Sequence, residues 1–337
     1  MVASILTMTV FFAVGYFLMF LLSDKIRTLT STDMTYHFKT DVTIYVFLMM
    51  FISFSGSYLI GRNFFDAVVP LPFWKVMVPF IAASVIYGLF LMEMNKIFMM
   101  AVVLFSFICG FILIEPSSLM FKDVIPGFVE ISGYCLIASV IALSGKVLKG
   151  VHGLFSLYLL MFMAGLALLA FMGGLPIYFA YFACFCCGLW VVAFQVNMYD
   201  ENLHFNEGSA VLMMFLIGSF FLMAVNELTF SSVLILAACP IAELMWAIVG
   251  ICFLKNRSPD LYTYTPFYKK YLEGVNAVIL QNLLFKLLVM NILFSLVQLY
   301  APNVFTFLFL TMVFNFWMFS KLHTSKEQEV LENKTEE

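Results

Sequence analysis

A short stretch near the middle of the chain carries residue types suited to binding an anion. Lys146, Lys149 and His152 lie on one connector between two long apolar runs, interleaved with three glycines. Cationic side chains and glycine backbone donors together suit a phosphate or another anionic group at a membrane surface. The same stretch also fits a simpler role, because a basic connector anchors one side of a membrane protein in the cytoplasm. The stretch alone leaves both interpretations open.

The composition indicates a polytopic membrane protein. Of the 337 residues, 64% are hydrophobic and 11% are charged, whereas soluble domains average about 25% charged residues. A membrane span needs about 20 apolar residues. By this measure the sequence predicts eleven spanning helices, at 4–22, 42–59, 74–92, 97–114, 127–144, 154–171, 176–196, 209–226, 229–252, 275–299 and 303–320.

We therefore predict an all-α fold, a polytopic integral membrane helix bundle with about eleven transmembrane helices. Residues 1–320 form a single membrane domain, and 321–337 form a polar, disordered cytoplasmic tail. Of the seventeen Lys and Arg residues, thirteen lie after odd-numbered spans or in the tail, and three lie in or near the other connectors. This bias predicts an outside N-terminus and a cytoplasmic C-terminus. No pattern typical of nucleic-acid binding is present.

Several connectors on the predicted cytoplasmic side resemble known motifs. Lys149-Gly-Val-His-Gly-Leu154 matches Asp-Gly-x-Asp-Gly-Leu with both aspartates replaced, and Phe205-Asn-Glu-Gly-Ser209 resembles a contracted Phe-x-Gly-Asp-x-Gly-Ser. Pro240-Ile-Ala-Glu243 resembles Pro-Leu-x-Asp in the ninth span. In this order, the motifs resemble those of the polyprenyl-phosphate N-acetylhexosamine-1-phosphate transferases, which move a sugar phosphate from a UDP carrier to undecaprenyl phosphate. The chain departs from that family around 265–270, where its histidine cluster is missing.

The resemblance implies roles for several other residues. Glu93 stands near the family's acidic pair after the third span, and Asn197 stands in the place of a nucleotide-binding Asn. In the family, Mg²⁺ neutralises the pyrophosphate while a lipid phosphate oxygen attacks and UMP leaves. Carboxylates suit Mg²⁺ because it is a hard cation. Lys149 and His152 replace two of these acids, so we expect no metal at this place.

Our leading interpretation is a degenerate relative that binds a polyprenyl phosphate in envelope glycan synthesis, for the cell wall or lipopolysaccharide. The resemblance then implies a place in the inner (cytoplasmic) membrane. Lys146, Lys149 and His152 would bind the phosphate without a metal cofactor, because an ammonium group pairs with phosphate as a point charge. Relatives in this family are often dimers, so a homodimer is consistent with the resemblance.

Two alternatives stay open. The first is an active transferase that uses a UDP-sugar and Mg²⁺, with metal ligands from the acids Glu93, Asp200, Glu207 and Glu243. The second is a transporter of a lipid-linked sugar. Asn282 and Lys286 are four residues apart in the tenth span and share one helix face, whereas Gln281 and Asn291 lie on other faces.

Overall fold

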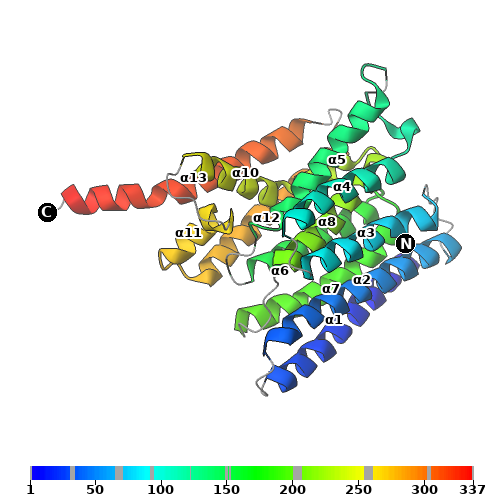
Figure 1. Cartoon of the computed structure of the whole chain (residues 1–337), viewed down its shortest axis with the longest axis horizontal. Helices are drawn as coiled ribbons and strands as arrows, with labels where there is room; N and C mark the ends of the chain where they lie inside the picture. The colour runs from blue at the N-terminus through cyan, green and yellow to red at the C-terminus, as the bar shows by residue number, and fades with distance from the viewer. Residues whose placement is uncertain are drawn as a thin grey trace.

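The computed structural model of the chain is helical, and the part that it describes contains no β-strand (Figure 1). The described residues are 2–30, 35–64, 71–91, 95–121, 123–148, 151, 153–199, 207–253, 261–301 and 305–335. The helices are α1 (Val2–Thr30), α2 (Thr35–Phe64), α3 (Phe73–Leu91), α4 (Asn95–Leu113), η1 (Pro116–Ser118), α5 (Gly127–Ser144), α6 (Leu154–Phe171), α7 (Ile177–Tyr199), α8 (Glu207–Val225), α9 (Phe230–Leu236), α10 (Ala238–Phe253), η2 (Leu261–Tyr264), α11 (Pro266–Leu272), α12 (Ala277–Leu299) and α13 (Thr306–Thr335).

The architecture is that of a multi-pass membrane protein. Eight of the described helices are long and apolar enough to cross a membrane, and the bent pair α9 and α10 gives up to nine. Shorter apolar helices cover Ile97–Leu113 and Thr306–Leu322. An apolar helix therefore overlaps each predicted span. The number of crossings and the orientation of the N-terminus stay predictions.

Helix α8 is the centre of the bundle. Every residue from Gly208 to Val225 is buried. A helix that is apolar on all sides is covered around its whole circumference by neighbours. Helices α3, α4, α5 and α9 pack directly against α8, and Figure 1 shows it in the interior of the bundle. Both ends of α8 are therefore held in place by the surrounding helices.

The predicted ninth span, 229–252, is a broken helix. It divides at Ala237 into α9 and α10, whose axes differ by 62°. Pro240 explains the position of the break, because a proline ring clashes with the carbonyl four residues earlier, here that of Leu236. The break changes the direction of the chain beside α12 and α13, which both pack against α9.

The C-terminal helix extends beyond its apolar part. The sequence predicts a disordered tail at 321–337, whereas the α13 backbone is helical as far as Thr335. Lys, Glu, Gln and Leu are good helix formers, and a helix that is already nucleated propagates readily through such residues. In Figure 1 this polar end of α13 projects from the bundle.

Aromatic packing joins the helices on one side of α8. The ring of Phe54 in α2 lies 4.8 Å from that of Phe182 in α7, 5.3 Å from Phe80 in α3 and 5.7 Å from Phe220 in α8, measured between ring centroids. Edge-to-face and offset pairs at such distances are favourable beyond the area they bury. This cluster fixes the positions of α2 and α3 relative to α8.

Candidate functional site

The candidate site lies where α5 ends and α8 begins. We call this region the Lys146 end of the bundle. Lys146 follows the last turn of α5, and Glu207 opens α8. The Lys146 Nζ lies 2.6 Å from the Glu207 Oε1, and the two side chains are 21% and 36% exposed. So short a distance is typical of a charge-assisted hydrogen bond between an ammonium group and a carboxylate. Its partial exposure leaves the pair open to a ligand or to solvent.

Two glycines allow the backbones to approach closely at this end. A Cβ on Gly145 would lie 2.7 Å from the carbonyl oxygen of Ala210, and a Cβ on Gly208 would collide with the ring of Phe90 in α3. Real Cβ atoms do not approach other atoms so closely, so larger residues at either place would push the helices apart. The close approach brings Lys146 within reach of Glu207.

The connector after α5 is packed against the bundle. Val147, Leu148 and Val151 are only 2%, 3% and 4% exposed. Val147 packs with Leu244 and Ala247 of α10 and with Tyr264. A wet surface loop would leave such residues exposed. The described residues of the connector are therefore packed parts of the bundle.

Gly153 ends the connector in a conformation that favours glycine. Its φ is +75°, and a Cβ there would lie 2.6 Å from the Nε2 of Gln281 in α12. Glycine adopts positive φ without steric cost, whereas other residues are strained there. The backbone conformation and the close contact with Gln281 thus explain why the motif has a glycine at this position.

Buried hydroxyl groups lie beside this end of the bundle. The Thr43 Oγ1 of α2 lies 2.7 Å from the Ser209 Oγ of α8 in a buried hydrogen bond. Thr43 also borders a cavity of about 280 Å³ between α2 and α3, which Leu212 of α8 lines as well. Tyr87 borders the same cavity, and its buried hydroxyl has no hydrogen-bond partner. An apolar cavity with a few polar groups thus begins within two turns of Glu207.

The structure describes some of the predicted site residues. It brings Lys146 and Glu207 together. Glu243 lies in α10 with 3% of its surface exposed, and its Oε1 has no hydrogen-bond partner. Asn197 is near the end of α7, but its side chain lies outside the described part. The remaining residues that were singled out also lie outside it: Glu93, Lys149, His152 and Asp200.

The acids do not gather into a metal centre in the described ranges. Among those residues, no group of three or more His, Cys, Asp or Glu side chains is placed to bind a metal ion. Glu207 contacts a lysine, which would oppose a cation at the same carboxylate. Of the acids proposed for Mg²⁺, those described are therefore not arranged as a ligand set.

The polar residues of the tenth predicted span lie as the helical period predicts. Lys286 and Asn282 are exposed on one face of α12, whereas Gln281 and Asn291 are buried. Lys286 therefore lies on the outer face of the bundle, a position from which a long side chain can reach the membrane interface. Glu243 is buried elsewhere and does not pair with it.

Sequence reasoning missed Thr43, Ser209 and Tyr87 as parts of the site. Hydroxyl residues in apolar runs usually bond to their own helix, so their types carry little signal. Their positions in the sequence are more informative than their types. Thr43 is the first residue of its span, and Ser209 lies two residues after Glu207. No known protein family matches the chain, and comparison with curated proteins finds no significant match.

Proposed function

We propose that this protein binds a polyprenyl phosphate at the Lys146 end of the bundle, as a degenerate relative of the polyprenyl-phosphate sugar-1-phosphate transferases. The observation that carries the proposal is the ion pair between Lys146 and Glu207. Lys146 lies three residues before the motif at Lys149–Leu154, and Glu207 lies within the motif at Phe205–Ser209. The two residues are in contact although they are far apart in the sequence. In this proposal the Lys146 end faces the cytoplasm, and the protein acts in envelope glycan synthesis in the inner membrane.

Lys146 supplies the first contact to the phosphate. An ammonium group has three donors, of which Glu207 occupies one, and two remain for phosphate oxygens. Glu207 also neutralises one positive charge. The net attraction for an anion therefore depends on the other basic residues of the connector, Lys149 and His152. Glu207 holds Lys146 in position in this arrangement and is not a metal ligand.

The cavity between α2 and α3 suits the first part of the polyprenyl chain. Its volume is about 280 Å³, and it is lined mainly by apolar residues such as Phe47, Leu48 and Leu212. A lipid whose phosphate contacts Lys146 can place its hydrocarbon chain along α8 into this space. The hydroxyl of Tyr87 and the apolar wall would then face the chain near its polar end. Ligand cavities generally combine apolar walls with a few such polar groups.

The binding experiment separates a metal-free clamp from a magnesium enzyme. The purified protein in lipid nanodiscs should bind undecaprenyl phosphate in excess EDTA, as measured by native mass spectrometry. The double variant Lys146→Ala, Lys149→Ala should bind at least tenfold more weakly. Lys75→Ala is the matched control, because it removes a cation at the opposite end of α3 and should leave binding unchanged. Binding that requires Mg²⁺, or that is equal in the double variant, contradicts the proposal.

Turnover tests the rival transferase. Release of UMP from UDP-sugars is measured with Mg²⁺ or Mn²⁺ and undecaprenyl phosphate present. The proposal predicts no release above that of a protein-free control. Turnover that Glu207→Gln abolishes would instead establish Glu207 as an active-site acid and overturn the degenerate reading.

A transporter is the second candidate function, and the broken helix favours it. The 62° break between α9 and α10 lies beside α12 and α13. Between those two helices, the Asn315 Nδ2 donates to the Asn291 Oδ1 over 3.0 Å, while the Asn291 Nδ2 and Asn315 Oδ1 have no partner. Broken helices with polar groups at mid-membrane occur in transporters. Flipping of a fluorescent lipid-linked sugar across proteoliposomes, lost in Asn315→Leu, would favour this candidate.

A further inference from the structure

Helix α12 runs parallel to α6, and this pairing indicates where α12 enters the membrane. A Cβ added to Gly153 would lie 2.6 Å from the side chain of Gln281, and one added to Gly174 would lie 2.7 Å from the side chain of Leu299. The two helices therefore begin and end at similar levels. The spanning segment of α6 begins at Leu154, directly after Gly153. The membrane surface at the Lys146 end therefore meets α12 near Gln281.

Two polar side chains lie on the outer face of α12 close to this level. Asn282 and Lys286 are exposed and lie four residues apart on one face of the helix. The rest of this face is apolar, since Ile279, Phe285 and Leu293 are 61%, 46% and 49% exposed. The outer face of α12 is thus an apolar surface that carries one cation and one amide.

The direction of helical side chains points Lys286 back towards Asn282. In a helix, Cα–Cβ bonds tilt towards the N-terminus, and long side chains extend over the preceding turn. Four residues of helix cover about 6 Å, and a flexible four-carbon stem can span such a distance. The ammonium group of Lys286 can therefore reach the level of the Asn282 amide, at the membrane surface.

The charge of Lys286 is not balanced within the described part of the chain. Lys286 forms no ion pair with a carboxylate there. Glu130 and Glu243 lie in spanning helices but are only 5% and 3% exposed, and Glu207 contacts Lys146. A second copy of the chain therefore offers none of these carboxylates on an outer face. Since an unpaired charge on a membrane-facing helix is costly, an anion from the membrane is the fitting partner.

We infer that Asn282 and Lys286 bind the phosphate of an anionic phospholipid on the outer face of α12. The ammonium group pairs with the phosphate as a point charge, and the Asn282 amide donates to a phosphate oxygen. The acyl chains then lie along Phe285 and Leu293. A zwitterionic lipid is a weaker partner, because its headgroup carries a positive charge of its own. This surface is separate from the cavity beside Thr43, and the inference does not rest on the proposed function.

Photo-crosslinking with two lipid probes tests this surface. The full-length protein is placed in nanodiscs of phosphatidylcholine with a small fraction of a probe lipid that carries a diazirine halfway along one chain. The probe is either phosphatidylglycerol or phosphatidylcholine, and adducts are located by peptide mass spectrometry. The phosphatidylglycerol probe should label residues 285–297 at least threefold more than the phosphatidylcholine probe. Equal labelling by the two probes would overturn the inference.

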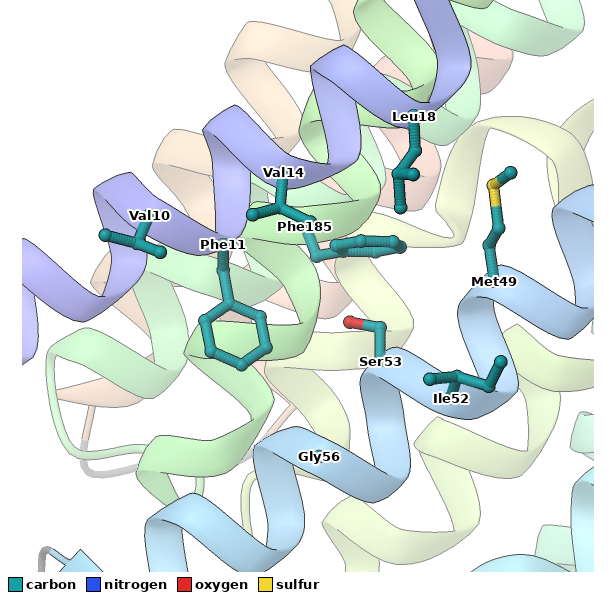
Figure 2. A pocket seen from close by; sticks show the side chains of 9 residues that line it. All are labelled: Val10, Phe11, Val14, Leu18, Met49, Ile52, Ser53, Gly56 and Phe185. Atoms are coloured by element: carbon teal, nitrogen blue, oxygen red, sulfur yellow. The ribbon is translucent and has the colours of Figure 1, made fainter. Parts of the chain in front are cut away.

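The groove between α1 and α2 is the internal reference for this comparison. Its lining residues, among them Val10, Val14 and Ile52, include no charged side chain (Figure 2). The lining therefore cannot distinguish the two headgroups by charge, and both probes should label residues 10–18 and 49–56 equally. A preference for phosphatidylglycerol at both places would show a general effect of lipid charge and contradict a site on α12.

Four variants assign the preference to the two polar residues. Lys286→Leu should abolish the preference at 285–297, whereas Lys286→Arg retains the charge and should retain the preference. Asn282→Leu should reduce the preference at least twofold. Lys75→Leu is the matched control, because it removes a cation at the opposite end of the bundle and should change nothing. These side chains are on the surface, so the thermal midpoint should stay as in the wild type. An unchanged preference in Lys286→Leu contradicts the inference.

Binding of undecaprenyl phosphate separates this surface from the Lys146 end. Lys286→Leu should bind undecaprenyl phosphate in EDTA as tightly as the wild type. Weaker binding would make Lys286 part of the polyprenyl-phosphate site and overturn its assignment to a phospholipid. Conversely, the preference for phosphatidylglycerol at α12 should persist in the Lys146→Ala, Lys149→Ala variant. The failure of either proposal is therefore distinguishable from the failure of the other.

Discussion

The two ends of α8 are connected to their neighbours by different chemistry. At its C-terminal end, called the Asn226 end here, the Asn226 side chain accepts from the Glu115 backbone N–H over 2.9 Å and donates to the Leu113 carbonyl over 2.8 Å. At the Lys146 end, two partly exposed side chains of opposite charge, Lys146 and Glu207, form the contact. The first arrangement satisfies backbone groups that α4 leaves open, whereas the second satisfies only two side chains.

A carboxylate near the Asn226 end is likewise hydrogen-bonded to backbone groups. Glu130 in α5 is 5% exposed and accepts from the backbone N–H groups of Met120 and Phe121 over 2.8 and 3.0 Å, and from the Tyr134 hydroxyl over 3.0 Å. By contrast, the Tyr87 hydroxyl near the Lys146 end has no partner and borders a cavity. The comparison teaches that Asn226 and Glu130 hold one end through hydrogen bonds to backbone groups, while the Lys146 end is joined by a partly exposed pair of side chains.

Glu130→Ala should have the largest effect on stability. It leaves the partly buried backbone N–H groups of Met120 and Phe121 without their acceptor, and hydrogen bonds to a charged group contribute about 1.5–3 kcal/mol each. We expect the free energy of unfolding in detergent to fall by about 3 kcal/mol. Glu130→Gln keeps an acceptor oxygen and should lose about half as much. A loss below about 1 kcal/mol would show that the loop 115–121 is held by other contacts.

Asn226→Ala should have the next largest effect. The variant breaks one bond to the Glu115 N–H and one to the Leu113 carbonyl. We expect the free energy of unfolding to fall by about 2 kcal/mol, while the affinity for undecaprenyl phosphate stays as in the wild type. Equilibrium unfolding and lipid binding are measured on the same preparation. Weaker lipid binding in the folded variant would show that the Asn226 end also contributes to lipid binding, which contradicts the separate roles of the two ends.

Gly88→Leu tests the cavity at the Lys146 end. Gly88 borders the cavity between α2 and α3, and a Cβ there meets no atom within 4 Å. The leucine side chain should occupy the space without disturbing the backbone. We expect roughly tenfold weaker binding of undecaprenyl phosphate, equivalent to about 1.4 kcal/mol. Gly133→Leu in α5 is the control, because a Cβ there also meets no atom within 4 Å. Equal affinity in both variants would place the lipid chain elsewhere.

The ion pair itself should contribute least to stability. Exposed pairs are typically worth about 0.2–1 kcal/mol. A double-mutant cycle with Lys146→Met and Glu207→Gln should therefore give a coupling energy below about 1 kcal/mol, which falls further in high salt. A coupling above about 2 kcal/mol would mean that the Lys146 end is as firmly connected as the Asn226 end.

The helices could be predicted from the sequence because each membrane-spanning helix is encoded by a local run of apolar residues. Apolar runs of about 20 residues mark the spans. The exposed face of α12 with Asn282 and Lys286 also follows from the helical period. The break at Ala237 was in principle readable from Pro240, although a proline alone does not say whether a helix bends or divides.

The site was harder to predict because its contacts join distant parts of the chain. The basic connector singled out Lys146 and the motif resemblance singled out Glu207, but only the packing of α5 on α8 shows that they touch. Thr43 and Ser209 are 166 residues apart, and no local pattern links them. Glu130 looks like an ordinary charged residue at the start of a span until the loop that it binds is folded against it.

The location of the lipid phosphate tests the central claim most directly. Polyprenyl phosphate that carries a diazirine next to its phosphate is cross-linked to the protein in nanodiscs, and the adducts are mapped by peptide mass spectrometry. The proposal predicts adducts at 143–148, 207–212 and 43–48, all around the Lys146 end, and their loss in the Lys146→Ala, Lys149→Ala variant. Adducts at 71–75 and 115–121, near the Asn226 end, or adducts spread evenly over the exposed helices, would contradict it.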